Sequence, residues 1–372
     1  MTGPLILLSA GGTGGHLFPA ESLANALAAK GARVALITDK RVGALSETFP
    51  AEEVIEIPSA TPSGRSIPRM GQAALLLGTG VAKAIPVIRR LRPAAVVGFG
   101  GYPTVPPVIA SALLRVPAMI HEQNGVMGRA NRLLARWASR IATGFPSVKG
   151  LPSDTAGRIV YTGNPVRPAV HAAARIAFSP LAPEGTLHLL VFGGSQGARV
   201  MSDVVPDAVA RMSEGARRRL SVVQQAREED LKRVRERYEG LQVKADVQPF
   251  FRDLPQRIAA AHLVVARSGA STVAELAVIG RPSILVPLPG ALDQDQAANA
   301  QTLADIGAAT VIPQEGFTPE RLAGEIQARL DDPDGLTRAS SAAKTAGVAD
   351  AAERLAQAVL QLAGSGNLGK KP

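Results

Sequence analysis

Residues 5–16 read LILLSAGGTGGH, an apolar run that ends in four glycines, a threonine and a histidine. Residues 187–198 follow the same design with LHLLVFGGSQGA. In each stretch we expect a buried strand to pass through a glycine turn into a helix. Such a turn brings backbone N–H groups and a helix N-terminus close to a bound anion. Two such stretches predict two α/β domains, each with a pocket of phosphate size, as an enzyme that joins two phosphate-bearing substrates would need.

Short apolar runs alternate with helix-length segments along the chain. Runs such as AAVVG at 94–98 and SILVP at 283–287 are continuous, which is typical of parallel strands buried on both faces. This alternation predicts two doubly wound, Rossmann-like sheets. The predicted strands are 4–9, 33–38, 54–57, 94–98, 117–121 and 158–161, then 187–192, 220–224, 243–248, 262–266, 283–287 and 309–312.

Two loop-forming stretches divide the chain. The Pro-rich segment Gly163–Pro168 predicts the main seam, and Asp331–Gly335 predicts a second one. We therefore expect a first domain over residues 1–163 and a second over residues 164–340. Residues 341–372 are expected to form a C-terminal helix that packs back towards the first domain and ends in a frayed tail.

Composition limits the possible functions. The chain has 372 residues, 46% of them apolar, which is enough for two cores. It has no cysteine, so disulfides and cysteine-bound metals are excluded. A formal net charge of +10 favours anionic partners. The apolar run at the start lacks the basic segment of a signal peptide, and the longest later run, 70–82, is too short to span a membrane.

Polar motifs follow several predicted strands, at the sheet edge where open α/β sheets bind ligands. His16, at the start of a helix, is expected to stay neutral, as a base must be; a helix-capping role is the alternative. His121–Asn124 follows the strand 117–121 and has loop capping as its alternative. Glu275 is suited to accept hydrogen bonds from two ribose hydroxyls, or it completes a capping box with Thr272.

The loop after residues 283–287 carries Asp293 and Asp295. Their spacing is that of a divalent metal site, but further carboxylate or histidine ligands are missing from the sequence around them. We therefore predict an amide-rich loop that contacts sugar hydroxyls, and no metal.

Two basic segments of the first half border apolar residues, a pattern suited to an anionic membrane surface. A core helix with a solvated rim is the alternative. The first segment has Arg65, Arg69, Lys83, Arg89, Arg90 and Arg92. The second is predicted to place Arg129, Arg132, Arg136 and Arg140 on one helical face beside Leu133, Leu134 and Trp137.

Taken together and in this order, the motifs from Gly11–His16 to Gln296–Ala300 resemble one family over nearly the whole chain. It is the family of peptidoglycan glycosyltransferases that add N-acetylglucosamine to undecaprenyl-pyrophosphoryl-N-acetylmuramoyl-pentapeptide, which turns lipid I into lipid II. The resemblance implies the GT-B architecture, in which two Rossmann-like domains face each other across a cleft. It also implies a peripheral place on the cytoplasmic face of the bacterial inner membrane and a reaction without a cofactor.

The resemblance also implies roles for single residues. The C-terminal domain would bind UDP-N-acetylglucosamine, with Phe251 by the uracil, Glu275 on the ribose and Ser195 on the pyrophosphate. His16 is the leading base and Glu122 the second choice. The implied donor-binding residues are Thr13, Gly14, Gly15, Asn124, Arg167, Ser195, Phe251, Ala270, Ser271, Thr272, Glu275 and Gln296. The implied residues for the lipid acceptor are Gly14, Gly15, His16 and Tyr102.

Two stretches depart from the family pattern. The sugar loop has Asp295-Gln296 where the family often has His-Gln or Gln-Gln, so sugar contact by Asp295 is not predicted. Gln224–Arg227 replaces a more usual His-Gln start and is given no role.

Three other functions compete with the transferase. The first is another GT-B enzyme on the same donor, such as a UDP-N-acetylglucosamine 2-epimerase or a transferase with a soluble acceptor. A nicotinamide-dependent oxidoreductase is disfavoured because Gly11–His16 lacks clean G-x-G-x-x-G spacing. A nucleic-acid binder is disfavoured because aromatic residues are only 3% of the chain and no known module is present.

Overall fold

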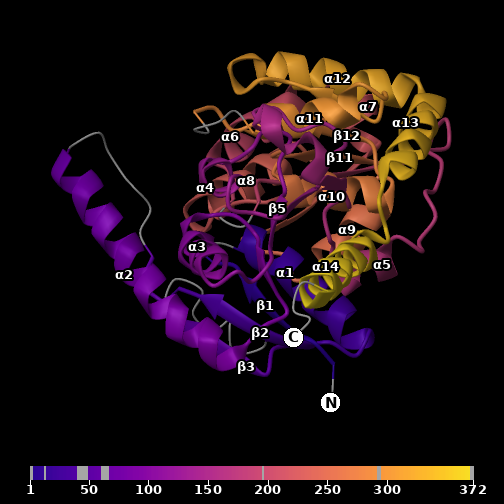
Figure 1. Ribbon diagram of the computed structural model, residues 1–372. Helices are drawn as coiled ribbons and strands as arrows, with labels where there is room; N and C mark the ends of the chain where they lie inside the picture. Colours follow the sequence, from indigo (N-terminus) through magenta and orange to yellow (C-terminus); the bar gives the residue numbers. More distant parts are fainter. Residues whose placement is uncertain are drawn as a thin grey trace. The chain divides into compact units, whose positions relative to one another are not determined.

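The computed structural model describes residues 3–11, 14–39, 49–59, 67–194, 197–290 and 295–368. The chain forms two compact units. Unit 1 is Met1–Arg167 together with Ala349–Pro372, and unit 2 is Pro168–Val348. Each unit has its own parallel sheet, with the helices connecting successive strands (Figure 1). The predicted α/β class with two Rossmann-like sheets is confirmed.

Unit 1 contains a seven-stranded sheet in the order β3-β2-β1-β4-β5-β6-β7. Its strands are β1 (Leu5–Ser9), β2 (Arg33–Thr38), β3 (Glu53–Glu56), β4 (Ala95–Gly98), β5 (Ala118–Glu122), β6 (Arg140–Thr143) and β7 (Ile159–Tyr161). Its helices are α1 (Gly14–Ala29), α2 (Ile67–Leu91), α3 (Val105–Leu113), α4 (Arg129–Leu134) and α14 (Ala351–Leu368), with 3-10 turns η2 (Tyr102–Thr104) and η3 (Ser153–Arg158).

Strand β6 was not predicted, and the basic helix expected around it is shorter than the sequence indicates. Helix α4 ends at Leu134, and Arg140 is the first residue of β6. Arg136 and Arg140 therefore do not lie on one helical face with Arg129, and that prediction is wrong. The arginine spacing is helical, but pairing of β6 between β5 and β7 determines the local structure.

Unit 2 contains a six-stranded parallel sheet in the order β10-β9-β8-β11-β12-β13. Its strands are β8 (Leu187–Phe192), β9 (Leu220–Gln225), β10 (Lys244–Gln248), β11 (Leu263–Ala266), β12 (Ser283–Leu285) and β13 (Ala309–Val311). Its helices are α5 (Pro168–Ala173), α6 (Arg199–Arg211), α7 (Glu214–Arg218), α8 (Glu228–Gly240), α9 (Leu254–Ala260), α10 (Ala270–Ile279), α11 (Asp295–Ala304), α12 (Pro319–Asp331) and α13 (Pro333–Ala346), with a 3-10 turn η4 (Gln314–Gly316).

The expected second seam at Asp331–Gly335 is a helix junction inside unit 2. Asp332 is the N-cap of α13, and its Oδ1 accepts a hydrogen bond from the Gly335 N–H at 2.9 Å. Helix α12 therefore leads almost directly into α13. The chain returns to unit 1 only at Ala349.

The C-terminal helix α14 is part of the core of unit 1. Its Leu355 and Val359 are fully buried in one apolar cluster with Leu23 and Leu27 of α1. Figure 1 shows α14 in yellow beside α1. The first and last helices of the chain thus stabilise the same sheet.

In both sheets the strand order reverses at the strand that precedes a glycine turn, β1 in unit 1 and β8 in unit 2. In unit 1 the chain continues from β1 to β2 on one side and later to β4 on the other, and in unit 2 β8 has β9 and β11 as its neighbours. In open α/β sheets the ligand crevice lies at such a switch point, beyond the carboxyl ends of the strands. The fold therefore puts each glycine turn at the expected ligand position of its unit.

Candidate active site

Three strand ends of unit 1 meet at His16, the third residue of α1. The loop after β5 contributes Gln123, whose Oε1 lies 3.0 Å from His16 Nδ1. The loop after β4 contributes Gly100 and Gly101, with φ of 84° and 71°. Cβ atoms built on these glycines would lie 3.4 Å from His16 Cε1 and 3.5 Å from His16 Nε2. These positive φ angles favour glycine, and they bring the backbone of this loop against the imidazole.

Glu122 is buried and holds the loop that follows it. Its carboxylate accepts hydrogen bonds from Asn124 N at 3.0 Å, Gly128 N at 2.9 Å and Asn131 Nδ2 at 2.8 Å. Burial raises the pKa of Glu122, and the same donors oppose that shift. This geometry indicates that the Glu122 carboxylate positions Asn124 and the loop after β5. It favours this role over that of catalytic base, for which Glu122 was the second choice.

For the other site residues predicted in the first half, the structure gives a position in the fold but no contact that indicates a ligand. Tyr102 begins η2 directly after the two glycines. Arg167 lies in unit 1, with its guanidinium carbon 5.0 Å from the centroid of the Phe18 ring. Gly14 and Gly15 begin α1. Thr13 lies outside the described residues, and the binding roles of this group stay predictions.

The described part of the second glycine turn is held by residues that sequence reasoning left without a role. Gln225, at the end of β9, accepts a hydrogen bond from Gly193 N at 3.1 Å and donates one to the Pro249 carbonyl at 3.1 Å. It thus connects the ends of three neighbouring strands. The Arg227 guanidinium lies 3.4 Å from the Gly197 carbonyl oxygen. Ser195 lies outside the described residues.

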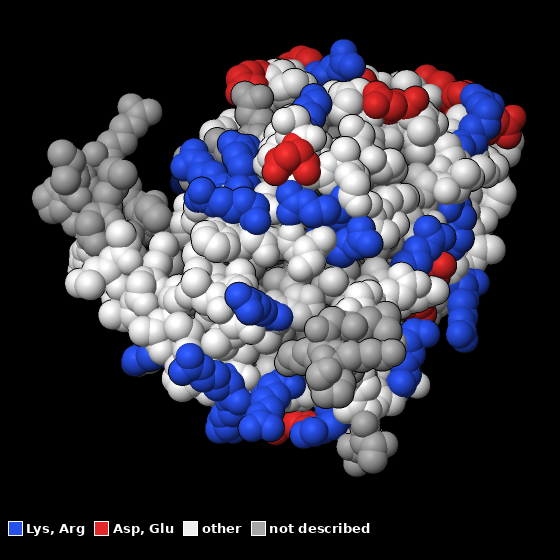
Figure 2. Space-filling view, in the orientation of Figure 1, with Lys and Arg blue, Asp and Glu red and all other residues white. Residues whose placement is uncertain are grey.

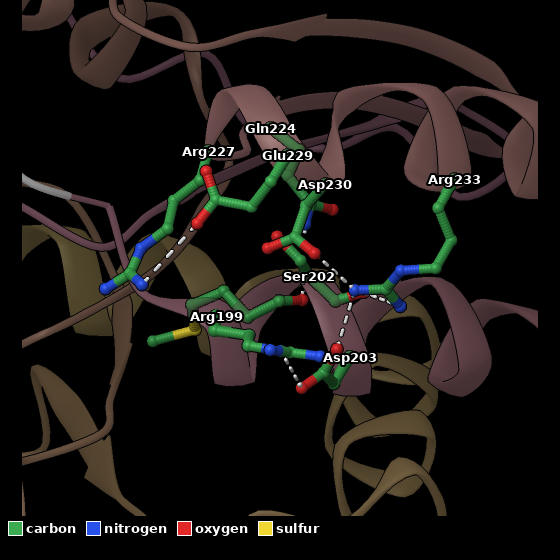
Figure 3. A network of polar contacts seen from close by, with 9 residues as sticks. Arg199, Ser202, Asp203, Gln224, Arg227, Glu229, Asp230 and Arg233 are labelled. Carbon is green, nitrogen blue, oxygen red and sulfur yellow. Dashed lines mark hydrogen bonds and ion pairs between the residues drawn. The ribbon is translucent and has the colours of Figure 1, made fainter.

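Helices α6 and α8 behind this turn are joined by ion pairs (Figure 3). Arg233 of α8 contacts Asp203 of α6 at 2.6 Å and Asp230 at 2.8 Å. In Figure 3 the Arg227 guanidinium lies on the opposite side of this network, 3.8 Å from Glu229. These contacts fix the N-terminal part of α6, which directly follows the glycine turn.

The start of α10 differs from the capping-box alternative. Gly269 is the N-cap, without a side-chain hydrogen bond, and Ala270, Ser271 and Thr272 form the first turn. Thr272 therefore lies inside the helix, and the capping box with Glu275 is wrong. The N–H groups of this first turn lie beyond the carboxyl end of β11, where a helix end favours an anion. Glu275 is buried one turn further along.

Gln296 of the predicted sugar loop contacts the turn between β11 and α10. The Ser268 hydroxyl donates a hydrogen bond to the Gln296 carbonyl at 2.8 Å, and Gln296 Oε1 accepts one from Leu288 N at 3.1 Å. Asp295 starts α11, and its Oδ1 accepts from Gln296 N at 2.8 Å. The Asp295 carboxylate thus contacts its own helix end. Asp293 lies outside the described residues, and the described ones include no group of three or more His, Asp or Glu side chains that could hold a metal.

Phe251 follows β10 and is buried. The Arg257 guanidinium carbon lies 4.3 Å from the centroid of its ring. This packing fixes the backbone at the end of β10. The predicted backbone contact of Phe251 with uracil stays a prediction.

Comparisons with known proteins agree over both units. The model of the glycosyltransferase family 28 N-terminal domain matches residues 6–143, and that of the family 28 C-terminal domain matches residues 188–355. A protein of Methylobacterium sp. (strain 4-46) is 63% identical over 362 residues, or 97% of each chain. One of Rhodopseudomonas palustris (strain HaA2) is 55% identical over 360 residues, covering 97% of this chain and 98% of its own. Both are named UDP-N-acetylglucosamine–N-acetylmuramyl-(pentapeptide) pyrophosphoryl-undecaprenol N-acetylglucosamine transferase.

Solved structures show the same fold. Acinetobacter baumannii MurG superimposes with a TM-score of 0.78 at 28% identity, over 96% of this chain and 100% of that one. A UDP-GlcNAc 2-epimerase from Neisseria meningitidis gives a TM-score of 0.66 at 11% identity, over 96% and 100% of the two chains. At that identity the second likeness concerns the fold alone.

Proposed function

The chain belongs to the family 28 glycosyltransferases that move N-acetylglucosamine from UDP-N-acetylglucosamine to undecaprenol-pyrophosphoryl-N-acetylmuramyl-pentapeptide, and we propose that its two units divide the two substrates between them. The chain is accordingly a transferase that converts lipid I into lipid II. In the proposed division, unit 1 takes the lipid acceptor at Gly14–His16 and Tyr102. Unit 2 takes the sugar nucleotide at the start of α10, Glu275 and Gln296. The glycine turn at the switch point of each sheet supports one ligand site in each unit, and the family resemblance assigns the acceptor to unit 1 and the donor to unit 2.

The proposed reaction inverts the anomeric carbon of N-acetylglucosamine. The 4-hydroxyl of N-acetylmuramate attacks that carbon, the bond from it to the β-phosphate oxygen breaks, and its electron pair leaves with UDP. The hydroxyl proton passes to His16, and the transition state resembles an oxocarbenium ion. First-turn N–H groups of α10, together with Ser195, stabilise the negative charge that grows on UDP.

The experiment for this function is an incubation with UDP-N-acetylglucosamine and a lipid I analogue. We expect UDP release only when the analogue is present, with one N-acetylglucosamine joined to it for each UDP released. UDP release without the analogue, or formation of an epimerised sugar, would point to the epimerase alternative.

Replacing Glu275 by alanine is expected to weaken donor binding. The carboxylate is buried on α10, and in the proposed site it accepts hydrogen bonds from the ribose hydroxyls. Loss of a buried acceptor costs about 1–3 kcal/mol, so KM for UDP-N-acetylglucosamine should rise roughly 5–150-fold. Titration calorimetry with UDP measures the effect on a variant with an unchanged melting curve. The exposed Glu184→Ala is the control, and equal UDP affinities of the two variants would exclude Glu275 from the donor site.

We further propose that unit 1 attaches the enzyme to anionic membranes. Helix α2 exposes Leu75 at 69% and also has Lys83 and Arg89 on its surface. Figure 2 shows basic side chains gathered over the end of α2 and β3. Near α4, the exposed Trp137 lies beside Arg136. Exposed apolar side chains bordered by cations fit a surface of anionic lipid. Within the described residues, helices with the length and apolarity of a membrane span are absent.

Reversing the charges of Lys83, Arg89 and Arg136 should weaken liposome binding. Each basic residue near an anionic surface contributes about 1 kcal/mol, and high salt should have the same effect as the reversals. Co-sedimentation with phosphatidylglycerol vesicles is the measurement. The control reverses Arg175, Lys232 and Lys244, which are exposed in unit 2 and give the same change in net charge. Equal losses in both triple variants would show a general charge effect and contradict a membrane surface on unit 1.

A further inference from the structure

We propose that Gln123 is a positioning residue that fixes the tautomer of His16, so that the ring nitrogen Nε2 is the proton acceptor. Gln123 follows β5 and is 5% exposed. Its Nε2 lies 3.2 Å from the Phe99 carbonyl oxygen. A backbone carbonyl only accepts hydrogen bonds. The side-chain group of Gln123 that faces Phe99 must therefore be the NH₂, which turns Oε1 to the other side.

The orientation of the Gln123 amide determines the proton on His16. Gln123 Oε1 lies 3.0 Å from His16 Nδ1. An amide oxygen only accepts, so Nδ1 must carry the proton. In a neutral imidazole with its proton on Nδ1, Nε2 holds the lone pair. The series of hydrogen bonds from the Phe99 carbonyl through Gln123 to His16 thus allows one neutral tautomer of His16, the one with the proton on Nδ1.

The remaining nitrogen faces the loop after β4. His16 Nε2 lies 3.5 Å from a Cβ built on Gly101, and the proposed acceptor residue Tyr102 follows this glycine. Histidine in water favours the opposite neutral tautomer, with the proton on Nε2. In that tautomer Nε2 has no free lone pair and cannot accept a proton. The inference rests on the proposed function only in its last step, which makes the Nε2 lone pair the base for the acceptor hydroxyl.

Nitrogen NMR of the ¹⁵N-histidine-labelled protein at pH 8 tests the tautomer directly. The chain has five histidines, and two of them serve as internal references. His121 Nε2 lies 3.2 Å from the Gly163 carbonyl, and His262 Nδ1 accepts a hydrogen bond from His188 N at 2.9 Å. Both must therefore carry the proton on Nε2, while His16 is expected to carry it on Nδ1.

The Gln123→Met variant removes the amide and keeps the side-chain length. We expect the His16 proton to move towards Nε2, with the His121 and His262 signals unchanged as a sign of an intact fold. We expect kcat to fall on the order of ten- to hundred-fold, by analogy with removal of the partner that orients a metal-bound imidazole, with little change in KM for the sugar nucleotide. Gln248→Met in unit 2 is the matched control and should leave both readouts unchanged.

The proposal is overturned if wild-type His16 carries its proton on Nε2, or if Gln123→Met leaves both the tautomer and kcat unchanged. Failure of the proposed function would give a different result from failure of the tautomer proposal. In that case the wild-type enzyme releases no UDP in the presence of the lipid I analogue, whatever tautomer His16 has.

Discussion

The His16→Ala enzyme is expected to lose turnover by roughly 10²–10⁴-fold, the range for removal of a general base. His16 is the third residue of α1, and the strand ends of β4 and β5 contribute the residues around its ring. A base acts only when deprotonated, so the wild-type rate should fall as the pH drops below the pKa of His16. This acid limb of the pH–rate profile should be absent from the variant.

The pH profile separates the base from a mere ligand of the acceptor pyrophosphate. Loss of a ligand would raise KM for the lipid acceptor and leave the acid limb in place. In both cases UDP binding should survive, because Glu275 and the first turn of α10 belong to unit 2. The control is His171→Ala on α5. Near-normal turnover of His16→Ala at saturating acceptor would exclude the base role.

The sequence predicted the two sheets because their central strands are continuous apolar runs. Each of the twelve predicted strands corresponds to a strand of the structure within a few residues. Strand β6 was missed because its first residue, Arg140, fits the helical arginine spacing that begins at Arg129. Its strand pairing depends on β5 and β7, which lie elsewhere in the sequence.

The candidate site was predictable as a set of strand-end loops but not as a set of contacts. The sequence indicated Glu122 as a possible base, yet its oxygens are occupied by donors up to nine residues away. Gln123 was indicated only as a member of the motif His121–Asn124, because its contact with His16 spans 107 residues and leaves no local pattern. Likewise the capping box of Thr272 matched a local pattern, while the chain turn at Gly269 sets the actual start of α10.

The largest stability loss is expected from Arg281→Met, at a position without any sequence signal of function. Arg281 is 1% exposed, and burial lowers its pKa to about 10, so it stays charged at neutral pH. Its guanidinium donates to the carbonyls of Ala259 and Ile279, near the ends of α9 and α10, and to that of Ile176 after α5. One side chain thus satisfies the carbonyl ends of two helices and joins them to the start of unit 2.

Methionine fills similar space but leaves these carbonyls buried without their donor. Each unsatisfied group costs about 1–3 kcal/mol, so loss of the donor to these three carbonyls should lower the free energy of unfolding by at least about 3 kcal/mol. Urea unfolding measures it, with the exposed Arg237→Met as control, for which about 0–1 kcal/mol is expected. Arg281→Lys should recover only part of the loss, because an ammonium group cannot reproduce the planar fork of donors.

Arg281→Met should keep the wild-type affinity for the sugar nucleotide while it is folded. Arg281 contacts the C-terminal end of α10, whose ten residues span about 15 Å, whereas the proposed pyrophosphate site is at the N-terminal end. UDP binding at low temperature, below the unfolding transition, should therefore match the wild type. A folded Arg281→Met with weakened UDP binding would show that the carbonyl ends and the anion site are coupled through α10. An unchanged urea midpoint would show that the carbonyls do not depend on the guanidinium.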